Sequence, residues 1–460
     1  MTAANALPRF DPGPPRPTAG ALDPVRRLLE RRLSARLREL LRAMAILFAY
    51  NRIGAVFTVA VGILAARWMG PLEYGKVGLV AQIASIVSLV LLAGAHASMY
   101  RFLPGAVASE RAVLQGSALA GSGLVTLALG TVYLALRARM DGLLHVPLLA
   151  WDLAAALSLS LAATTLTESF LRGRLKFTLI ARLRFASALA FFASFMLLFA
   201  GLRRMSVGLY FGGLVGSQLL FAVLASAAGG LGRLRTSRAG LRQVFGFGLL
   251  NTSSALLLVF FGSSDLLIVN YLLPARDLGV YNIYQGSIRG QFATLFFEVF
   301  CVVFMPTIAS MDKLDVHRRF QRTIPLLIAG VSVAAAGLLV VGVGLAGARY
   351  PLDLRYVALA AAGVATTAVF QISSAILSME GVRGARLCLL PIAAALPISA
   401  GLQLWLTRRM GITGAMLGVV AGNLVLAAFL ELTIRLSRRW LGADARPVAV
   451  AESESEGAMP

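Results

Sequence analysis

The stretch TIPLLIAGVSVAAAGLLVVGVGLAG, residues 323–347, contains no charged side chain. It is longer than the roughly 20 apolar residues that an α-helix needs to cross the ~30 Å hydrocarbon core of a bilayer. Its apolar residues are continuous and do not alternate with polar ones, which is not the pattern of a membrane β-barrel strand. The stretch therefore predicts a transmembrane helix.

The composition of the whole chain indicates that many such helices are present. Of 460 residues, 58% are hydrophobic and 14% are charged, and the mean hydropathy is +0.79. Soluble domains have about 45–50% apolar and about 25% charged residues. The values exclude a soluble globular, disordered or fibrous protein and favour a polytopic helical membrane protein. The two cysteines, Cys301 and Cys388, form no metal-binding or disulfide pattern.

Twelve apolar runs are long enough to be transmembrane helices. They lie at 44–67, 77–100, 113–136, 147–171, 178–201, 206–228, 244–272, 278–305, 323–347, 356–379, 387–406 and 411–437. We therefore expect an all-α polytopic membrane protein.

The distribution of basic residues predicts the orientation of these helices. Most of the 43 Lys and Arg residues lie in the two tails and in the even-numbered connections between the spans. Basic residues favour the cytoplasmic side, so both termini are predicted to be cytoplasmic, which agrees with an even number of spans. This topology explains the formal net charge of +22 better than nucleic-acid binding does.

The tails have different compositions. Residues 1–23 are rich in Pro, Gly and Ala and are expected to be disordered. Residues 24–43 place leucines at helical spacing between arginines, which predicts an amphipathic helix on the anionic cytoplasmic leaflet. A basic nucleic-acid-binding arm is the alternative interpretation of that segment. Residues 438–460 are expected to be a cytoplasmic C-terminal tail.

The chain resembles itself in three places at a nearly constant offset. The corresponding stretches are Trp68-Met-Gly-Pro71-Leu-Glu-Tyr-Gly75 with Tyr271-Leu-Leu-Pro274-Ala-Arg-Asp-Leu-Gly279, Glu168–Gly173 with Glu380–Gly384, and Gly208, Gly212 and Gly216 with Gly414, Gly418 and Gly422. Each match is weak by itself, because small residues at this spacing are common in membrane helices. Three matches in the same order indicate an internal repeat.

The repeat predicts two six-helix halves, residues 44–228 and 244–437, around a central cavity. The basic linker 229–243 joins them on the cytoplasmic side. Because six is an even number, both halves insert in the same direction. Transporters built from such parallel repeats bind their substrate between the halves and alternate its access to the two sides of the membrane.

Three stretches resemble the polysaccharide-biosynthesis flippases of the Wzx type. They are Ile63-Leu-Ala-Ala-Arg-Trp-Met-Gly-Pro-Leu-Glu-Tyr-Gly75 followed by Gln82-Ile-Ala-Ser-Ile, Asp265-Leu-Leu-Ile-Val-Asn-Tyr-Leu-Leu-Pro-Ala-Arg-Asp-Leu-Gly-Val-Tyr281, and Gly411-Ile-Thr-Gly-Ala-Met-Leu-Gly418. The resemblance covers residues 44–437. It extends to the superfamily that also holds the lipid II flippases and the drug/sodium antiporters.

The resemblance implies a substrate and a cellular location. Members of the family move an undecaprenyl-pyrophosphate-linked oligosaccharide, such as an O-antigen, capsule or exopolysaccharide repeat unit, across the bacterial cytoplasmic (inner) membrane. The expected partners are the lipid bilayer, the lipid-linked oligosaccharide, a coupling ion (sodium or proton) and other polysaccharide-assembly proteins. No nucleic acid is expected.

Charged residues inside the spans are candidates for function, because each costs at least about 2.5–3.5 kcal/mol at the bilayer centre. Arg52 lies in the first span beside Asn51, on a face with small and polar residues. It is a candidate for binding pyrophosphate, and the resembling lipid II flippases have a cationic cavity partly lined by the first helix. Alternatively, its long side chain reaches the cytoplasmic headgroups.

Arg289 lies close to the predicted membrane midplane, where a side chain does not easily reach the headgroups. Tyr281, Gln285 and Phe292 share its helical face. Aromatic and amide groups around a guanidinium suit sugars and phosphates, so Arg289, Gln285 and Tyr281 are candidate cavity residues. The alternative is a structural ion pair between Arg289 and Asp265 of the preceding span.

Four acidic residues have two interpretations each. Asp265 and Glu298 either form polar contacts between helices or couple transport to an ion, and Glu298 lies on the face of its helix opposite to Arg289. Glu168 and Glu380 lie at cytoplasmic helix ends. Each either pairs with the arginine that follows it or belongs to a cytoplasmic gate.

No catalytic motif is present. HExxH, GxSxG and the Walker loop GxxxxGK[ST] do not occur. We therefore expect no enzymatic activity, no cofactor and no metal site. Two alternatives to the flippase remain: an ion-coupled multidrug exporter on the same scaffold, and a membrane polysaccharide polymerase or ligase.

Overall fold

The computed structural model describes residues 35–140, 146–202, 205–229, 234–287, 290, 313–378 and 381–441. The regular structure in these ranges is helical, as predicted. The chain divides into two units, Met1–Ile46 and Leu47–Pro460. The predicted tail 1–23 and the predicted amphipathic helix before Ala35 lie outside the described residues, as does the C-terminal tail after Leu441.

The described residues form α-helices and one short π-helix. They are α2 (Ala35–Leu92), α3 (Ala95–Phe102), α4 (Ala108–Met140), α5 (Leu148–Gly173), α6 (Phe177–Leu202), α7 (Val207–Gly229), α8 (Arg238–Leu272), α9 (Ala275–Tyr281), the π-helix η1 (Asn282–Ser287), α12 (Lys313–Ala346), α13 (Leu354–Ser378) and α14 (Gly381–Leu441).

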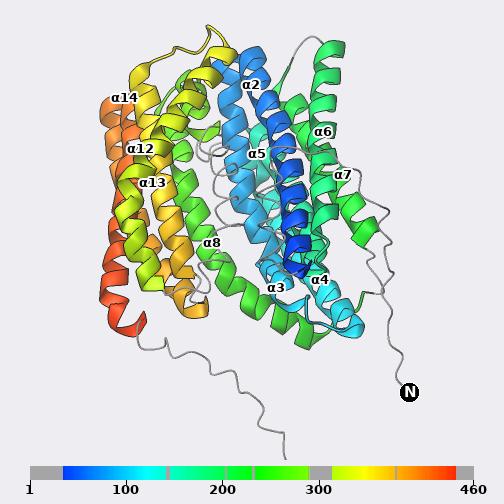
Figure 1. Cartoon of the computed structure of the whole chain (residues 1–460). Helices are drawn as coiled ribbons and strands as arrows, with labels where there is room; N and C mark the ends of the chain where they lie inside the picture. Colours follow the sequence, from blue (N-terminus) through cyan, green and yellow to red (C-terminus); the bar gives the residue numbers. More distant parts are fainter. Residues whose placement is uncertain are drawn as a thin grey trace, which may run out of the picture. The chain divides into compact units, whose positions relative to one another are not determined.

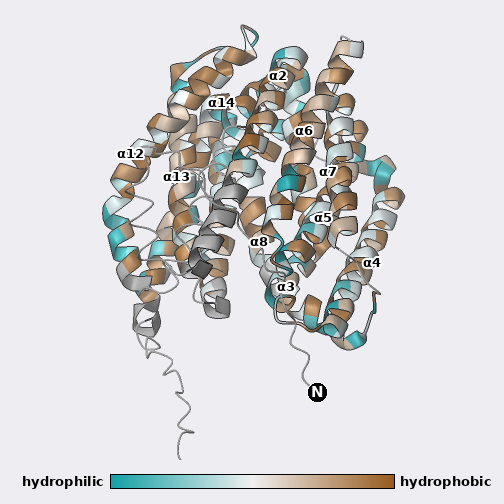
Figure 2. Cartoon of the chain, turned by 45° about the vertical axis from the view of Figure 1, so that its right-hand side comes forward, coloured by the Kyte–Doolittle hydropathy of each residue, from teal (hydrophilic) through white to brown (hydrophobic). Residues whose placement is uncertain are grey.

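Most of these helices have the length and composition of membrane spans. Among the described residues, nine helices are long and apolar enough to cross a bilayer. Figure 2 shows apolar residues along the length of these helices. The chain is therefore a multi-pass membrane protein.

Two of the long helices cover two predicted spans each, because a bend replaces the expected loop. Gly70 has φ 74° and precedes Pro71 inside α2, and Gly411 has φ 59° inside α14. A positive φ suits glycine, and proline cannot donate the next helical hydrogen bond. The predicted span 278–305 lies mostly outside the described residues. The number of twelve spans consequently stays a prediction.

Two predicted boundaries differ from the structure. The predicted span 77–100 is interrupted after Leu92, where Gly94 has φ 82° and a Cβ on it would lie 2.0 Å from the carbonyl oxygen of Gly248. The predicted linker 229–243 is helical from Arg238, because the Ser237 side chain caps α8 by accepting a hydrogen bond from the Gly240 N–H at 2.9 Å. Hydropathy alone predicts neither the interruption at Gly94 nor the start of α8 at Arg238.

The helices pack in two groups within the second unit. α5 packs against α3, α4, α6 and α7, whereas α13 packs against α12 and α14, and α14 against α8. Figure 1 shows α12–α14 on one side and α4–α7 on the other, with α8 reaching both groups. The first part of α8 packs against α3 and α4. α8 thus contacts both groups, and the two six-helix halves and the repeat that relates them stay a prediction.

Candidate functional site

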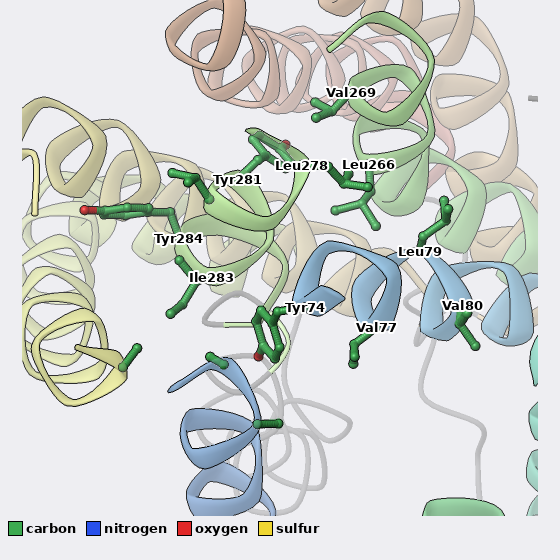
Figure 3. Packing of buried hydrophobic residues seen from close by; sticks show 14 of the residues in the cluster. Tyr74, Val77, Leu79, Val80, Leu266, Val269, Leu278, Tyr281, Ile283 and Tyr284 are labelled. Carbon is green, nitrogen blue, oxygen red and sulfur yellow. The ribbon is translucent and has the colours of Figure 1, made fainter. Parts of the chain in front are cut away.

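α2 and α9 approach each other along a contact that we call the glycine seam (Gly75, Gly279 and the Pro71 carbonyl). A Cβ on Gly75 would lie 2.9 Å from the backbone nitrogen of Gly279, and a Cβ on Gly279 would lie 1.7 Å from the carbonyl oxygen of Pro71. Only glycine allows the two backbones to approach so closely. Figure 3 shows the buried side chains of α2, α8, α9 and η1 that surround this contact.

Hydrogen bonds from side chains also hold the seam together. They involve the segment of α2 that follows the bend. The Tyr74 and Ser287 hydroxyl oxygens lie 2.8 Å apart, and Asn282 Nδ2 donates to the Tyr74 carbonyl at 3.1 Å. Asn282 fits because Gly78 has no side chain: a Cβ there would lie 2.2 Å from Asn282 Oδ1. The α2 segment after Pro71 is therefore held to η1 by polar and close backbone contacts.

A second contact uses a carbonyl near the α2 bend. The Tyr350 hydroxyl, between α12 and α13, donates to the Ala66 carbonyl at 3.2 Å. Burial raises the pKa of Tyr350 well above its usual range, so the hydroxyl keeps its proton and remains a donor. The contact ties the α2 segment before the bend to the connection between α12 and α13.

A central cavity of about 460 Å³ extends from the seam between the two helix groups. Its walls come from both segments of α2, from α7, from η1 and from α12. The lining residues are Thr58, Val59, Gly62, Ile63, Ala66, Tyr74, Val77, Gly78, Ala81, Gln82, Ser85, Tyr210, Asn282, Ile283, Gly286, Ser287, Gly290, Leu338, Val341 and Gly342. None of these described lining residues is charged.

A polar cavity of about 340 Å³ adjoins the central cavity. Gln82, Ser85, Gly286 and Gly290 line both. The other residues that line the polar cavity are Leu258, Val259, Phe261, Gly262, Ser263, Ser264, Asp265, Thr367, Phe370, Gln371, Ser399, Gln403, Gly418, Val419, Gly422 and Asn423. They come from α8, α13 and both segments of α14.

Glycines let the two segments of α14 approach each other beside the polar cavity. A Cβ on Gly418 would lie 2.4 Å from Gln403 Oε1, and a Cβ on Gly422 would lie 3.1 Å from the Ser399 Cβ. The sequence indicates a small-residue packing face here, and the structure shows which helix segment it contacts. The close approach brings Ser399 and Gln403 to the wall of the cavity.

Asp265 and Tyr281, both candidates from the sequence, contact each other. The Tyr281 hydroxyl donates to Asp265 Oδ2 at 2.7 Å, and the Leu266 backbone N–H donates to Asp265 Oδ1 at 2.8 Å. Tyr281 is fully buried and lines neither cavity, whereas Asp265 lines the polar cavity. Tyr281 therefore positions a carboxylate in this conformation and does not face the cavity itself.

Gln285 also lies away from both cavities. Its side chain is fully buried, and neither amide atom has a hydrogen-bond partner among the described residues. It packs on Gly363 of α13, where a Cβ would lie 2.6 Å from Gln285 Nε2. The sequence placed Tyr281 and Gln285 on a cavity face by α-helical spacing. The π-helix changes that spacing, so Asn282, Ile283, Gly286 and Ser287 line the central cavity instead.

The remaining charged candidates are separated from the cavities or undescribed. Arg52 is partly exposed on α2 and lines neither cavity. The side chain of Asn51 lies outside the described residues. Arg289, Glu298 and Glu380 also lie outside the described residues.

Glu168 forms an ion-pair cluster at the end of α5. Its carboxylate accepts from Arg172 Nε at 2.7 Å, as the spacing predicts, and additionally from Arg184 Nε at 3.0 Å and Nη2 at 2.9 Å. The Glu168 side chain is 5% exposed, while those of Arg172 and Arg184 are 41% and 36% exposed. The cluster joins α5 to α6, and a role as a gate stays a prediction.

The amide and hydroxyl residues of the polar cavity were not among the candidates predicted from the sequence. A signal was present, because Thr367 and Gln371, and likewise Ser399 and Gln403, are polar pairs four residues apart inside apolar spans. Such pairs lie on one helix face and indicate a polar environment for it. These pairs are uncharged, so a criterion based on charged residues does not identify them.

Comparison with solved structures defines the class of fold. An inward-facing multidrug resistance MATE family transporter of the MOP superfamily matches with TM-score 0.65, 13% identity, and coverage of 87% of this chain and 99% of the other. The lipid II flippase MurJ, inward closed, matches with TM-score 0.61, 14% identity and coverage of 85% and 87%. An outward-facing MATE family transporter of the same superfamily matches with TM-score 0.50, 13% identity and coverage of 87% and 93%. The chain therefore has the fold of MOP superfamily transporters.

A comparison with protein families is more specific. A model of the family described as "Polysaccharide biosynthesis protein" matches residues 63–347, which is more than half of the chain. The chain belongs to this polysaccharide biosynthesis protein family, which confirms the resemblance found in the sequence. No curated protein matches the chain.

Proposed function

We propose that this protein is a flippase that moves a polyprenyl-pyrophosphate-linked oligosaccharide across the cytoplasmic membrane of a bacterium. The observation that carries the proposal is the central cavity, which both helix groups line. The family assignment supports a substrate from polysaccharide biosynthesis. A substrate bound between two groups of helices gains access to either side when the groups move relative to each other.

In the proposed cycle the structure represents an inward-facing state. The predicted orientation places the α2 bend outside, so the seam and the Tyr350–Ala66 contact form a closed outer end. The higher TM-score with the inward-facing than with the outward-facing transporter supports this assignment. We further propose twelve spans in two parallel six-helix halves, 44–228 and 244–437, with cytoplasmic termini.

The pyrophosphate requires cations, which the described walls of both cavities do not supply. We assign this role to Arg289, which follows the η1 lining residues in sequence, and to Arg52 on the α2 segment that leads to Thr58. An arginine holds phosphate oxygens through a planar fork of donors, which lysine does not have. Asp265 is in this proposal either the ion partner of Arg289 or a residue that couples transport to a cation.

A deletion strain complemented with variants tests the proposal. Deletion is expected to abolish surface polysaccharide and to cause the lipid-linked oligosaccharide to accumulate. Arg289→Ala is expected to give the same phenotype as the deletion. Arg289→Lys is expected to restore part of the surface polysaccharide. Arg408→Ala, an exposed arginine in α14, is the matched control and is expected to complement fully. Protein abundance in the membrane is measured for each variant.

Two results would overturn parts of the proposal. Unchanged polysaccharide in the deletion strain, together with increased sensitivity to cationic drugs, would indicate a multidrug exporter. Near-normal export by the double variant Arg289→Ala with Asp265→Ala would reduce Arg289 to a structural partner of Asp265, because removing both leaves no unpaired charge in the membrane.

A further inference from the structure

The polar cavity presents neutral hydrogen-bonding groups in addition to Asp265. Its described lining contains four side-chain amides, namely Gln82, Gln371, Gln403 and Asn423, several hydroxyls, and no basic side chain. The described lining of the central cavity has no basic side chain either, so the larger number of amides distinguishes the polar cavity from the central one. Sugar hydroxyl groups both donate and accept hydrogen bonds, and amides provide both functions.

In three of these side-chain amides, the protein binds one of the two polar atoms, the oxygen or the nitrogen, and not the other. Ser263 Oγ donates to Gln82 Oε1 at 2.8 Å, which leaves Gln82 Nε2 as a donor. Gln403 Nε2 donates to the Ala415 carbonyl at 2.9 Å, while its Oε1 lies beside the lining residue Gly418. Both glutamines are thereby held in one orientation with the other half of the amide available.

Asn423, which lies on α14 as Gln403 does, shows the same arrangement. Its Nδ2 lies 3.0 Å from Thr366 Oγ1 and 2.9 Å from Thr367 Oγ1, which leaves Oδ1 as an acceptor. Gln371 makes no hydrogen bond to another described residue, so both halves of its amide are available. The cavity therefore offers fixed donors and fixed acceptors on different walls, a mixture that a bare cation would not use.

The carboxylate of Asp265 is also held in place. The Tyr281 hydroxyl and the Leu266 N–H each bind one of its oxygens. These two contacts orient the carboxylate at the wall of the polar cavity.

The size and position of the polar cavity select part of a glycan. Its volume of about 340 Å³ is at the lower end of the roughly 300–1,000 Å³ of small-ligand pockets, so it accepts one or two sugar rings and not a whole oligosaccharide. Because Gln82, Ser85, Gly286 and Gly290 line both cavities, a ligand bound in the central cavity lies next to the polar cavity.

We infer that the polar cavity binds a sugar unit of the lipid-linked oligosaccharide and contributes to the selection of the glycan. The inference rests on the proposed function and adds a location for sugar recognition. Gln371 is the residue of choice for a test, since its replacement breaks no hydrogen bond among the described residues. Loss of one neutral hydrogen bond, about 1–1.5 kcal/mol, corresponds to a five- to tenfold loss of affinity.

The experiment compares two lipids on the full-length protein in nanodiscs. The probes are undecaprenyl pyrophosphate and the same lipid carrying the oligosaccharide repeat unit of the host, with affinities measured by thermophoresis. The wild-type protein is expected to prefer the glycosylated lipid. Gln371→Leu is expected to reduce this preference about five- to tenfold and to leave the affinity for the unglycosylated lipid unchanged. Gln218→Leu, which replaces a glutamine of α7 that lines neither cavity, is the control and should retain the preference.

A second measurement does not depend on the stability of the leucine variant. In a protein with Cys301 and Cys388 replaced by alanine, Gln371→Cys is expected to be protected from maleimide by the glycosylated lipid and not by the unglycosylated lipid. The sugar site would be overturned if Gln371→Leu kept the wild-type preference for the glycosylated lipid, or if both lipids protected Gln371→Cys from maleimide equally. Either result would leave the flippase proposal intact. Binding of neither lipid by the wild-type protein would overturn both.

Discussion

Gly75 of α2 and Gly279 of α9 lie directly against each other, although they are far apart in the sequence. A Cβ on Gly75 would be 2.9 Å from the backbone nitrogen of Gly279. Gly75 follows Pro71 by four residues, whereas Gly279 follows Pro274 by five. The two glycines match in the proposed internal repeat when one residue is inserted in the second stretch, and their contact is then compatible with a pseudo-twofold axis between the proposed halves.

The seam predicts the effect of adding one methyl group. Gly279→Ala would place a Cβ 1.7 Å from the Pro71 carbonyl oxygen, a backbone atom that has no side-chain freedom. We expect this variant to open the seam, to favour the outward-facing state and to reduce transport at least tenfold. The readout is labelling of a cysteine at Ile283, a lining residue of the central cavity, by an impermeant maleimide added outside.

A matched glycine provides the control. Gly212 of α7 has no atom within 4 Å of a Cβ built on it, so Gly212→Ala should leave both labelling and transport at the wild-type level. Unchanged labelling in Gly279→Ala would show that the seam does not close the cavity.

The hydrogen bond between Tyr74 and Ser287 should couple α2 to η1 energetically. Their hydroxyl oxygens are 2.8 Å apart. Tyr74→Phe and Ser287→Ala are each expected to lower stability by about 0.5–1.5 kcal/mol, and the double variant by less than the sum, because the second change finds the bond already lost. Thermal or denaturant unfolding in detergent gives the three values, and strict additivity would contradict a direct bond.

Glu168 is expected to act mainly in stability. Its buried carboxylate binds Arg172 and Arg184, whose side chains are partly exposed, so solvent screening limits the cost of Glu168→Gln to about 1–3 kcal/mol. We expect a lower unfolding temperature in detergent and near-normal transport per folded molecule. A variant with unchanged stability and abolished transport would instead support the cytoplasmic gate.

The predicted orientation is testable at two exposed positions in a protein without native cysteines. Thr236 precedes α8 in the basic linker, and Leu352 lies between α12 and α13. In intact cells, an impermeant maleimide should label Leu352→Cys and not Thr236→Cys, because the basic linker is predicted to be cytoplasmic. After permeabilisation both should react. The reverse pattern would invert the topology.

The sequence was sufficient for the helical class and for the family, because continuous apolar runs and the Gly-Pro stretch are local properties. It also located the bends at Gly70–Pro71 and near Gly411 as connections between spans, although it could not distinguish a bend from a loop. The twelve-span repeat depends partly on residues after Ser287 that lie outside the described part of the chain.

The candidate site was predicted less completely, for a physical reason. Arg52 and Asp265 attract attention because charges are costly in a membrane, yet only Asp265 lines a cavity here. The amides of Gln371 and Asn423 cost less, so the sequence gives a weaker signal for them. The π-helix after Tyr281 cannot be derived from hydrophobic spacing, and it determines which residues of that segment face the cavity.

The bend at Gly70–Pro71 also restricts how this chain can change in length. A surface loop absorbs an inserted or deleted residue, but here one helical segment continues directly into the next. One extra residue after the bend would rotate the following segment by about 100° and advance it by about 1.5 Å. Tyr74, Gly75 and Gln82 would all leave their partners together. Insertions and deletions at this point would therefore disconnect the seam and both cavities in a single event.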